Sequence, residues 1–411
     1  MNRKLNLLFV FCLVLPLCLL GCKDFGTSPG KQVTRPLTEL EKSLLQTSNQ
    51  FGFHLLRAVN QAETDSNVFI SPLSVSMALG MTLNGANGTT EEAMRSTLGF
   101  SGMTQEEINT TYYGLMQLLR NLDPKVRFDI ANSIWYRLGF KVEQGFVETN
   151  QRYFEAIVRG LEFGSAEASR TINSWVDKST SGKIQRIVPD VISPDVVMYL
   201  INAIYFKGMW TYKFDTTRTS DAPFHLPDGT TAQARLMQVR GTFSYAETAA
   251  YQAIELPYGD SLFSMIVVLP CPGQSIEAFV DEMTNDSWNA IKEGLHPQLG
   301  TMYLPKFKLE FGKSLVDQLR AMGMGVAFGA GADFTKINRD GGLFISDVEH
   351  KTFVQVDEEG TEAAAVTSVE ISRTSVGPPE FVMRVDRPFF FVITERSSGT
   401  LLFVGKIVEP K

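Results

Sequence analysis

Hydrophobic residues change their spacing several times along the chain, and each spacing predicts a different element. Apolar side chains recur every three or four positions over residues 37–62 and 74–83, which predicts amphipathic helices. Residues 169–179 and 314–322 have the same helical spacing. Residues 90–93, TEEA, match a capping box and predict the start of a further helix.

Strand patterns occupy much of the rest of the chain. Residues 127–136, RFDIANSIWY, alternate between the two faces of a strand, whereas residues 196–206 are almost continuously apolar, which suits a strand covered on both sides. Short strand patterns with polar turns between them then follow at 224–226, 253–256 and 264–269. Two apolar runs in residues 389–408 flank a Ser-Ser-Gly turn and predict a hairpin. No repeat or linker interrupts this succession after residue 36, so we predict one large α+β domain over residues 37–411.

One segment has a strand pattern but few of the bulky residues that usually stabilise a strand. Residues 357–372, DEEGTEAAAVTSVEIS, begin acidic and then alternate with a period of two. Of the alternate residues that would face a core, those near the start of the segment include alanines, which stabilise a strand poorly. These alternate residues are Thr361, Ala363, Ala365, Thr367, Val369 and Ile371. The segment therefore has the periodicity of a strand without the residues that stabilise one.

The N-terminus predicts export. A basic start at residues 2–4 precedes an apolar run over 5–20, which is short for a membrane-spanning helix. Residues 19–22, LLGC, resemble the bacterial lipobox, which implies cleavage before Cys22 and a diacylglycerol on its sulfur. An ordinary signal peptide with a chance cysteine is the alternative. We thus predict a signal peptide over residues 1–21, then the lipidated cysteine and a flexible tether to residue 36, on a protein anchored in the bacterial cell envelope, with the outer-membrane surface as a candidate location.

Cysteines and charge agree with that compartment. Of the four cysteines, Cys12 and Cys18 leave with the signal peptide, and lipidation of Cys22 leaves Cys271 without a partner. An exported domain without a disulfide depends on its hydrophobic core, and this chain is long enough to bury a large one. The formal charge is −7 and the basic residues are dispersed, so no nucleic-acid partner is expected.

Signals for enzymatic chemistry are weak. The four histidines have no metal-ligand spacing, and the chain contains no H-E-x-x-H, C-x-x-C or phosphate-loop motif, so we expect no cofactor and no metal. Residues 26–30, GTSPG, match the G-x-S-x-G pattern of hydrolases. They lie in the tether, without the strand and helix that would expose Ser28. An envelope hydrolase acting through Ser28 is therefore the weakest hypothesis.

Several segments together resemble the serpins, a family of serine protease inhibitors. Residues 67–74, NVFISPLS, resemble the family's early N-x-F-x-S-P-x-S segment, and residues 202–210, NAIYFKGMW, resemble its N-x-x-x-F-K-G-x-W strand. Further matches follow in the family's order at 304–307, His350, 385–389 and 405–408. The resemblance covers the chain from about residue 40 to its end. It implies an α+β serpin fold with a large central, mostly antiparallel sheet, further sheets and about nine helices.

The start of the segment at residues 357–372 resembles the hinge of an inhibitory reactive-centre loop. The matching residues are Glu358, Glu359, Gly360, Thr361, Glu362, Ala363, Ala364 and Ala365. The resemblance implies an exposed loop at about residues 358–380 that a serine protease attacks and that then inserts into the central sheet as a strand. The protease would be trapped as an acyl-enzyme, so the protein would be a monomeric suicide substrate rather than an enzyme. No proline lies between residues 357 and 377, so every N–H can join the sheet.

The family's spacing places the scissile bond at Thr374–Ser375, with Arg373–Thr374 as the alternative. Trypsin-like proteases select arginine, and elastase-like proteases prefer a small side chain such as threonine. The expected partners are therefore trypsin-like and elastase-like serine proteases, with cysteine proteases as a further class. A non-inhibitory serpin with a binding or chaperone-like role is the alternative. Such members typically carry proline or bulky charged residues in the hinge, and this chain does not.

By the same resemblance, six residues form a gate where the sheet opens: Ser71, Ser74, Asn202, Trp210, Lys306 and His350. His350 is expected to bond Asn202, Trp210 to lie at the top of the opening, and Lys306 to form an ion pair with Glu358. Val366 departs from the family's usual Ala, Gly or Ser. It has the outward parity, so we expect at most slower insertion of the loop.

Overall fold

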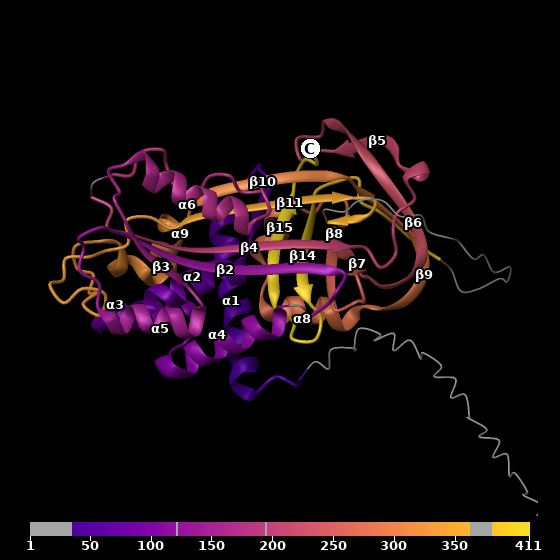
Figure 1. Ribbon diagram of the computed structural model, residues 1–411. Coiled ribbons are helices and arrows are strands. Elements are labelled where there is room, and N and C mark those ends of the chain that lie inside the picture. The colour runs from indigo at the N-terminus through magenta and orange to yellow at the C-terminus, as the bar shows by residue number, and fades with distance from the viewer. Residues whose placement is uncertain (1–34, 121, 194, 362–379) are drawn as a thin grey trace, which may run out of the picture. The chain divides into compact units, whose positions relative to one another are not determined.

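The structure is a computed structural model that describes residues 35–120, 122–193, 195–361 and 380–411 (Figure 1). These residues form a mixed α+β fold with nine α-helices and two β-sheets, as the family resemblance implies. The helices are α1 (Glu39–Ala62), α2 (Pro72–Leu83), α3 (Gly88–Leu98), α4 (Gln105–Leu119), α5 (Gln144–Phe154), α6 (Ala166–Ser179), α7 (Ile276–Asp281), α8 (Asn285–Gly294) and α9 (Val316–Leu319).

Both sheets are mostly antiparallel. The six-stranded sheet has the order β10 (Phe307–Ser314), β11 (Glu349–Asp357), β12 (Gly360–Thr361), β4 (Met198–Met209), β2 (Val126–Arg137) and β3 (Ile157–Leu161). The nine-stranded sheet has the order β1 (Val68–Ile70), β15 (Leu401–Ile407), β14 (Phe389–Glu395), β8 (Phe263–Pro270), β7 (Tyr251–Tyr258), β6 (Thr231–Glu247), β9 (His296–Pro305) and β13 (Phe381–Arg384), with β5 (Ser220–His225) paired to β6. The pairs β2–β3 and β13–β9 are parallel.

Six of the nine described α-helices begin with a side-chain capping bond, and α3, α5 and α9 do not. Thr38 and Glu41 form a capping box at the start of α1, close to the start predicted from the spacing. The capping box predicted at residues 90–93 is wrong, because α3 already begins at Gly88. Thr90 is buried inside that helix, and its hydroxyl accepts a hydrogen bond from the N–H of Asp333 instead.

The helix predicted at residues 314–322 is much shorter than its apolar spacing suggests. Only Val316–Leu319 is α-helical, and a widened turn follows over Arg320–Met324. Gly323 has a φ of 113°, a left-handed value that ends the helical path and that glycine adopts without strain.

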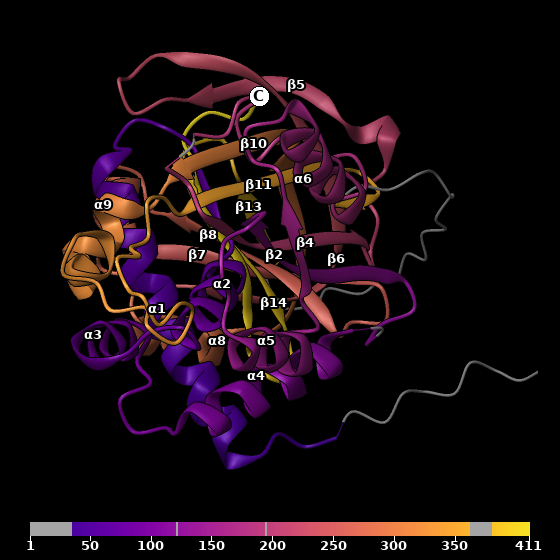
Figure 2. The ribbon, with the colours of Figure 1, turned by 60° about the vertical axis from the view of Figure 1, so that its left-hand side comes forward.

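Strand β4 is covered on both faces, as its apolar run predicted. Ile204 and Phe206 belong to the main core, which also contains α1 and α2. Ile201 instead packs with Trp135 and Ile172 in a second, smaller core beneath α6. Figures 1 and 2 accordingly show α6 and α2 on opposite sides of β4. The sheet thus has α6 on its outer face and the helical core on its inner face.

The C-terminal hairpin is present as predicted. Strands β14 and β15 pair antiparallel, and Phe69 of β1 stacks on Phe391 and Phe403 at ring-centroid distances of 5.5 and 5.0 Å. Cys271 is a free thiol. Within the described part of the chain, every helix is too short or too polar to cross a bilayer.

Candidate functional site

The six-stranded sheet is open along its middle. Strand β11 pairs with β10 and strand β4 pairs with β2, but no described hydrogen bond joins β11 to β4. Between them, β12 supplies two residues at the top. Of these, Thr361 lies opposite Val356 of β11 and Gly208 of β4. Below Thr361, the facing edges of β4 and β11 form what we call the slot.

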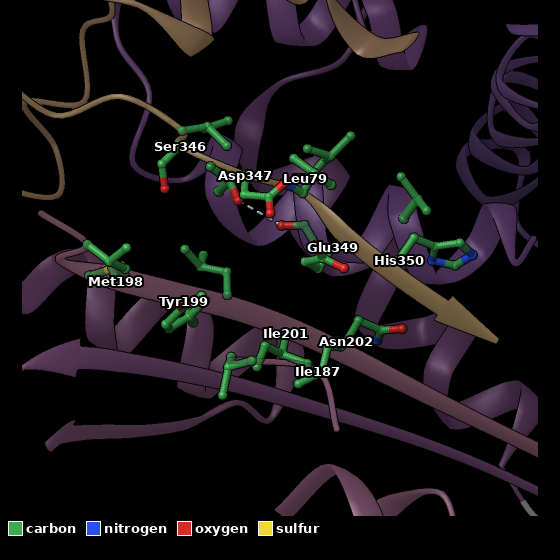
Figure 3. Close-up of a pocket in the computed structure, with 18 of the residues that line it drawn as sticks. Leu79, Ile187, Met198, Tyr199, Ile201, Asn202, Ser346, Asp347, Glu349 and His350 are labelled. Carbon is green, nitrogen blue, oxygen red and sulfur yellow. Dashed lines mark hydrogen bonds between the residues drawn. The ribbon is translucent and has the colours of Figure 1, made fainter. Parts of the chain in front are cut away.

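A cavity of about 200 Å³ lies in the slot (Figure 3). Its walls are residues 198–203 of β4 and residues 346–351, which include the start of β11. Helix α2 lies on one side, and Ile184, Ile187 and Val188 lie on the other. Leu79 and Ile187 are among the apolar side chains that line it (Figure 3). Unpaired strand edges are a template for another strand, since their N–H and C=O groups need partners. The slot can therefore accept a strand that is antiparallel to both rims.

The hinge of the predicted loop is held at the top of the slot by main-chain bonds. The N–H of Trp210 donates to the carbonyl of Glu359 at 2.8 Å, and the N–H of Phe214 donates to the carbonyl of Glu358 at 2.9 Å. The indole Nε1 of Trp210 donates to the carbonyl of Asp357 at 2.9 Å. Trp210 thus lies where the resemblance implied and fixes the start of the loop.

Gly360 and Thr361 fit the slot by close contact. A Cβ on Gly360 would lie 2.1 Å from the carbonyl oxygen of Gly208, so only glycine fits there. Thr361 is 2% exposed, and its Oγ1 lies 2.7 Å from the hydroxyl of Tyr258. The Tyr258 ring stacks on Trp210 at 4.4 Å, and burial raises the pKa of its phenol, so this hydroxyl keeps its proton.

Glu358 forms the ion pair with Lys306 that the sequence predicted. Its carboxylate accepts hydrogen bonds from Lys306 Nζ and from Thr219 Oγ1, each at 2.7 Å. Burial acts to raise the pKa of Glu358, but the bonds from Lys306 and Thr219 outweigh it and leave the pKa below its usual value. Glu358 is therefore ionised and joins the hinge to two neighbouring segments.

His350 and Asn202 face each other across the slot without a bond. The Nε2 of His350 accepts from the N–H of Ser71 at 3.0 Å, and burial lowers the pKa of His350 to about 4. The imidazole is thus neutral, with its proton on Nδ1. Asn202 donates to Asn132 at 2.7 Å, and its Oδ1 is buried without a hydrogen-bond partner among the described residues.

The bond expected between His350 and Asn202 is therefore wrong for this structure. The open slot separates β11 from β4 at this level, and the close-up shows the two side chains on opposite rims (Figure 3). Ser71 and Ser74 lie beside them at the start of α2, where Ser71 Oγ accepts from the N–H of Ser74 at 3.3 Å. Ser74 Oγ in turn donates to the carbonyl of Asn202 at 3.3 Å.

Three contact residues at this site were not found from the sequence. Tyr258, Thr219 and Asn132 bond Thr361, Glu358 and Asn202, respectively. Each lies far from its partner along the chain and in a segment without a motif, so spacing gave no signal. The predicted residues that lie outside the described part of the chain are Cys22, Glu362, Ala363, Ala364, Ala365, Arg373, Thr374 and Ser375.

Comparisons with known proteins agree with this geometry. A family model described as serpin (serine protease inhibitor) matches residues 46–410. The leukocyte elastase inhibitor of Sus scrofa is 33% identical over 387 residues, covering 90% of this chain and all of that protein. The native-state crystal structure of tengpin, a thermophilic serpin, has a TM-score of 0.83 at 30% identity, covering 91% of this chain and 95% of tengpin. Human thyroxine-binding globulin complexed with thyroxine also has a TM-score of 0.83, at 28% identity, with 90% and 100% covered.

Proposed function

Since the chain belongs to the serpin family, we propose that it inhibits serine proteases as a suicide substrate. A protease attacks the loop at Thr374–Ser375 or Arg373–Thr374 and becomes acylated by it. The severed loop then inserts into the slot and carries the protease to the far end of the sheet. Distortion of the protease stops deacylation, because the loss of one oxyanion-hole donor alone slows such a step by about 10²–10³-fold.

The open slot with Thr361 already at its top is the observation that carries this proposal. Strand β12 is antiparallel to both β11 and β4. Each further residue of the loop would therefore lie opposite the preceding residue of β11 and of β4. Continuing that register places Thr367 level with His350 and Asn202. Thr367 shares the inward parity of Thr361, so its hydroxyl would lie between the Nδ1–H of His350 and the unpartnered Oδ1 of Asn202. One hydroxyl can accept from the first and donate to the second.

Insertion also satisfies the main-chain groups of both rims. Each new hydrogen bond contributes about 0.5–1.5 kcal/mol net, so roughly ten of them supply a large driving force. The uncleaved protein is then held by a kinetic barrier rather than by the lowest free energy.

A gel tests the proposal. Incubation with trypsin or elastase should give a covalent complex that survives SDS. Thr361→Arg, which places a charge at a 2% exposed site, should convert the inhibitor into a substrate. Glu362→Arg, on the outward parity and level with the partly exposed Gln355 and Lys207, is the matched control and should still form the complex. Clean cleavage of the unmodified protein by both proteases, without complex, contradicts the proposal.

That negative outcome would favour the non-inhibitory alternative, a binding or chaperone-like role. Thyroxine-binding globulin has the same fold and was solved with thyroxine. The small residues at 363–365 and the glycine at 360 favour inhibition, because they let a strand enter without steric conflict.

We also propose that Cys22 is lipidated and anchors the protein in a bacterial envelope, where it protects the surface from foreign proteases. The residues LLGC before the tether support this. Expression of the full chain in a bacterium should place it in the membrane fraction with a diacylglycerol mass on Cys22. Cys22→Ser should release it, whereas Cys271→Ser, a matched thiol removal, should not. A soluble protein without added lipid mass contradicts the proposal.

A further inference from the structure

A cleft of about 580 Å³ lies on the outer face of the six-stranded sheet. It is lined by β10 and β11, the two strands at one edge of that sheet (Figure 1), and by residues 182–186, which follow α6. Glu310 of β10 lies opposite Phe353 of β11, and Gly312 lies opposite Lys351. A Cβ on Gly312 would lie 3.4 Å from Cγ of Lys351, so the glycine leaves room for a ligand beside this lysine.

The cleft concentrates positive charge on an acidic protein. Four basic side chains from three segments line it: Lys183, Arg186, Lys308 and Lys351. Among the described residues that line the cleft, Glu310 is the only one with a carboxylate. The whole chain has a formal charge of −7, so most of its surface repels an anion. The cleft is therefore a local site of attraction for a negatively charged ligand.

Two of the ammonium groups converge on one aromatic ring. The Nζ of Lys183 lies 4.8 Å from the ring centroid of Phe353, and the Nζ of Lys308 lies 5.6 Å from the same centroid. The ring attracts each cation, but the two like charges repel each other. An anion held by both ammonium groups would offset that repulsion and accept a charge-assisted hydrogen bond from each.

The ion pairs of Lys308 and Arg186 are too exposed to neutralise the cleft. Lys308 lies 3.5 Å from Glu310, with side chains 57% and 69% exposed, and Arg186 lies 2.9 Å from Asp190, with side chains 54% and 77% exposed. Pairs this exposed contribute little to stability. Lys351 uses one of its three N–H donors on the carbonyl of Arg186, at 2.8 Å. The cleft thus keeps donors that an incoming anion can use.

We propose that this cleft binds a phosphate group. A phosphate monoester carries about −1.5 to −2 charges and three acceptor oxygens, which match the ammonium groups of Lys183, Lys308 and Lys351. The group can come from free phosphate or from a lipid headgroup that ends in a phosphate monoester. The site depends on neither the reactive-centre loop nor Cys22, so phosphate binding can be measured whether or not the protein traps a protease.

Isothermal titration calorimetry of the uncleaved full chain with inorganic phosphate tests the site. Sodium chloride at the same ionic strength is the reference for general screening. Lys308→Met keeps the apolar stem and should weaken binding by about five- to tenfold, because one charge-assisted contact is lost. Glu310→Gln removes the only carboxylate of the described lining and should tighten binding by about twofold or more. This gain cannot come from a loss of folding.

Lys125→Met is the matched control. Lys125 is also ion-paired, with Asp260 at 2.6 Å, and its side chain is 54% exposed, but it lies outside the cleft. Its removal should leave the phosphate affinity unchanged. Lys308→Arg keeps the charge and should stay within about twofold of the unmodified protein. The proposal is overturned if phosphate does not bind, or if Lys125→Met and Lys308→Met lose the same affinity.

A soluble short-chain lipid separates the two sources of phosphate. Dihexanoyl phosphatidic acid that binds more tightly than inorganic phosphate, and loses affinity with Lys308→Met, identifies a lipid headgroup as the ligand. Equal or weaker binding identifies free phosphate. Dihexanoyl phosphatidylcholine has the same acyl chains but a phosphate diester that carries a cation, and it should not bind. Equal binding of the two lipids would show that the acyl chains are recognised, which contradicts a phosphate site.

Discussion

At the scale of single residues, the slot holds two complementary groups apart. Among the described residues, the buried Oδ1 of Asn202 has no donor, and His350 offers a proton on Nδ1 from the opposite rim. A buried polar group without a partner costs about 1–3 kcal/mol. The open sheet is therefore destabilised where the inserted strand would supply a hydroxyl, and insertion removes that cost.

The low pKa of His350 predicts a pH dependence of stability. Burial lowers the pKa to about 4, while the unfolded chain has the ordinary value near 6.5. Between these values the unfolded state binds more protons, so the free energy of unfolding falls as the pH drops from about 7 towards 4. The loss should reach roughly 3 kcal/mol.

Urea denaturation of the uncleaved protein at several pH values measures this effect. His350→Gln keeps an acceptor for the N–H of Ser71 without a titrating group, so its stability should fall much less over the same range. His54→Gln is the control, because His54 is only partly shielded and should contribute less. An equal acid sensitivity of the His350→Gln protein and the unmodified protein would contradict the assignment.

The position of Arg373 predicts two cleavage sites for two protease classes. Arg373→Ala should abolish the complex with trypsin and leave the complex with elastase, because elastase-like enzymes accept Thr374. Mass spectrometry of the released C-terminal fragment identifies each bond. A single cut shared by both proteases excludes the two-site version.

Contacts between residues that both belong to family motifs could be predicted, and contacts to residues outside those motifs could not. The pairing of Lys306 with Glu358 and the place of Trp210 follow from the family pattern. The bonds from Tyr258 and Thr219 depend on how far-apart segments fold against the hinge. No spacing in the sequence encodes that proximity.

At the scale of elements, β12 has only two residues, but its pairing with both β11 and β4 defines where the loop enters the sheet. Its glycine allows a close backbone approach that fixes Thr361 between the rims. Helix positions were predicted well where a capping residue and apolar spacing agreed, as in α1. They were wrong where a single residue overrode the spacing, as Gly323 does after α9.

Gly360→Ala tests the role of β12. A Cβ 2.1 Å from the carbonyl of Gly208 should expel the hinge from the slot and expose the base of the loop. We expect faster cleavage of the loop by trypsin and a smaller trapped fraction, because the same clash persists after insertion. Gly329→Ala is the matched control, since a Cβ there has no neighbour within 4 Å. Unchanged trapping by Gly360→Ala would show that the close approach is dispensable.

At the scale of the whole molecule, the fold could be predicted because its motifs are spread over most of the chain. The opening of the sheet was expected from the resemblance alone, because the periodicity of β4 and β11 is compatible with direct pairing as well as with separation. Strand β4 is mostly apolar and β11 alternates, and their apolar side chains are buried whether the two strands pair directly or stay apart. Which arrangement forms depends on how the whole sheet packs.

Cleavage of the loop should therefore raise the melting temperature. Roughly ten new hydrogen bonds at about 1 kcal/mol each, and about 2 °C per kcal/mol for a large domain, give an increase of about 20 °C. Calorimetry of intact and loop-cleaved protein measures it, with cleaved Thr361→Arg as a control that should show little gain. Equal melting temperatures would mean that the intact sheet stores no energy for inhibition.

Because Thr361 already lies between Val356 and Gly208, the register of an inserting loop would be set before the proposed cleavage. Thr361 sets the register in which the following residues would pair with both neighbouring strands. A slip of one residue would turn every inward side chain to the outside. In the proposed mechanism, the seated Thr361 would therefore exclude insertion in a wrong register, and the outcome after cleavage would depend only on the rate of insertion.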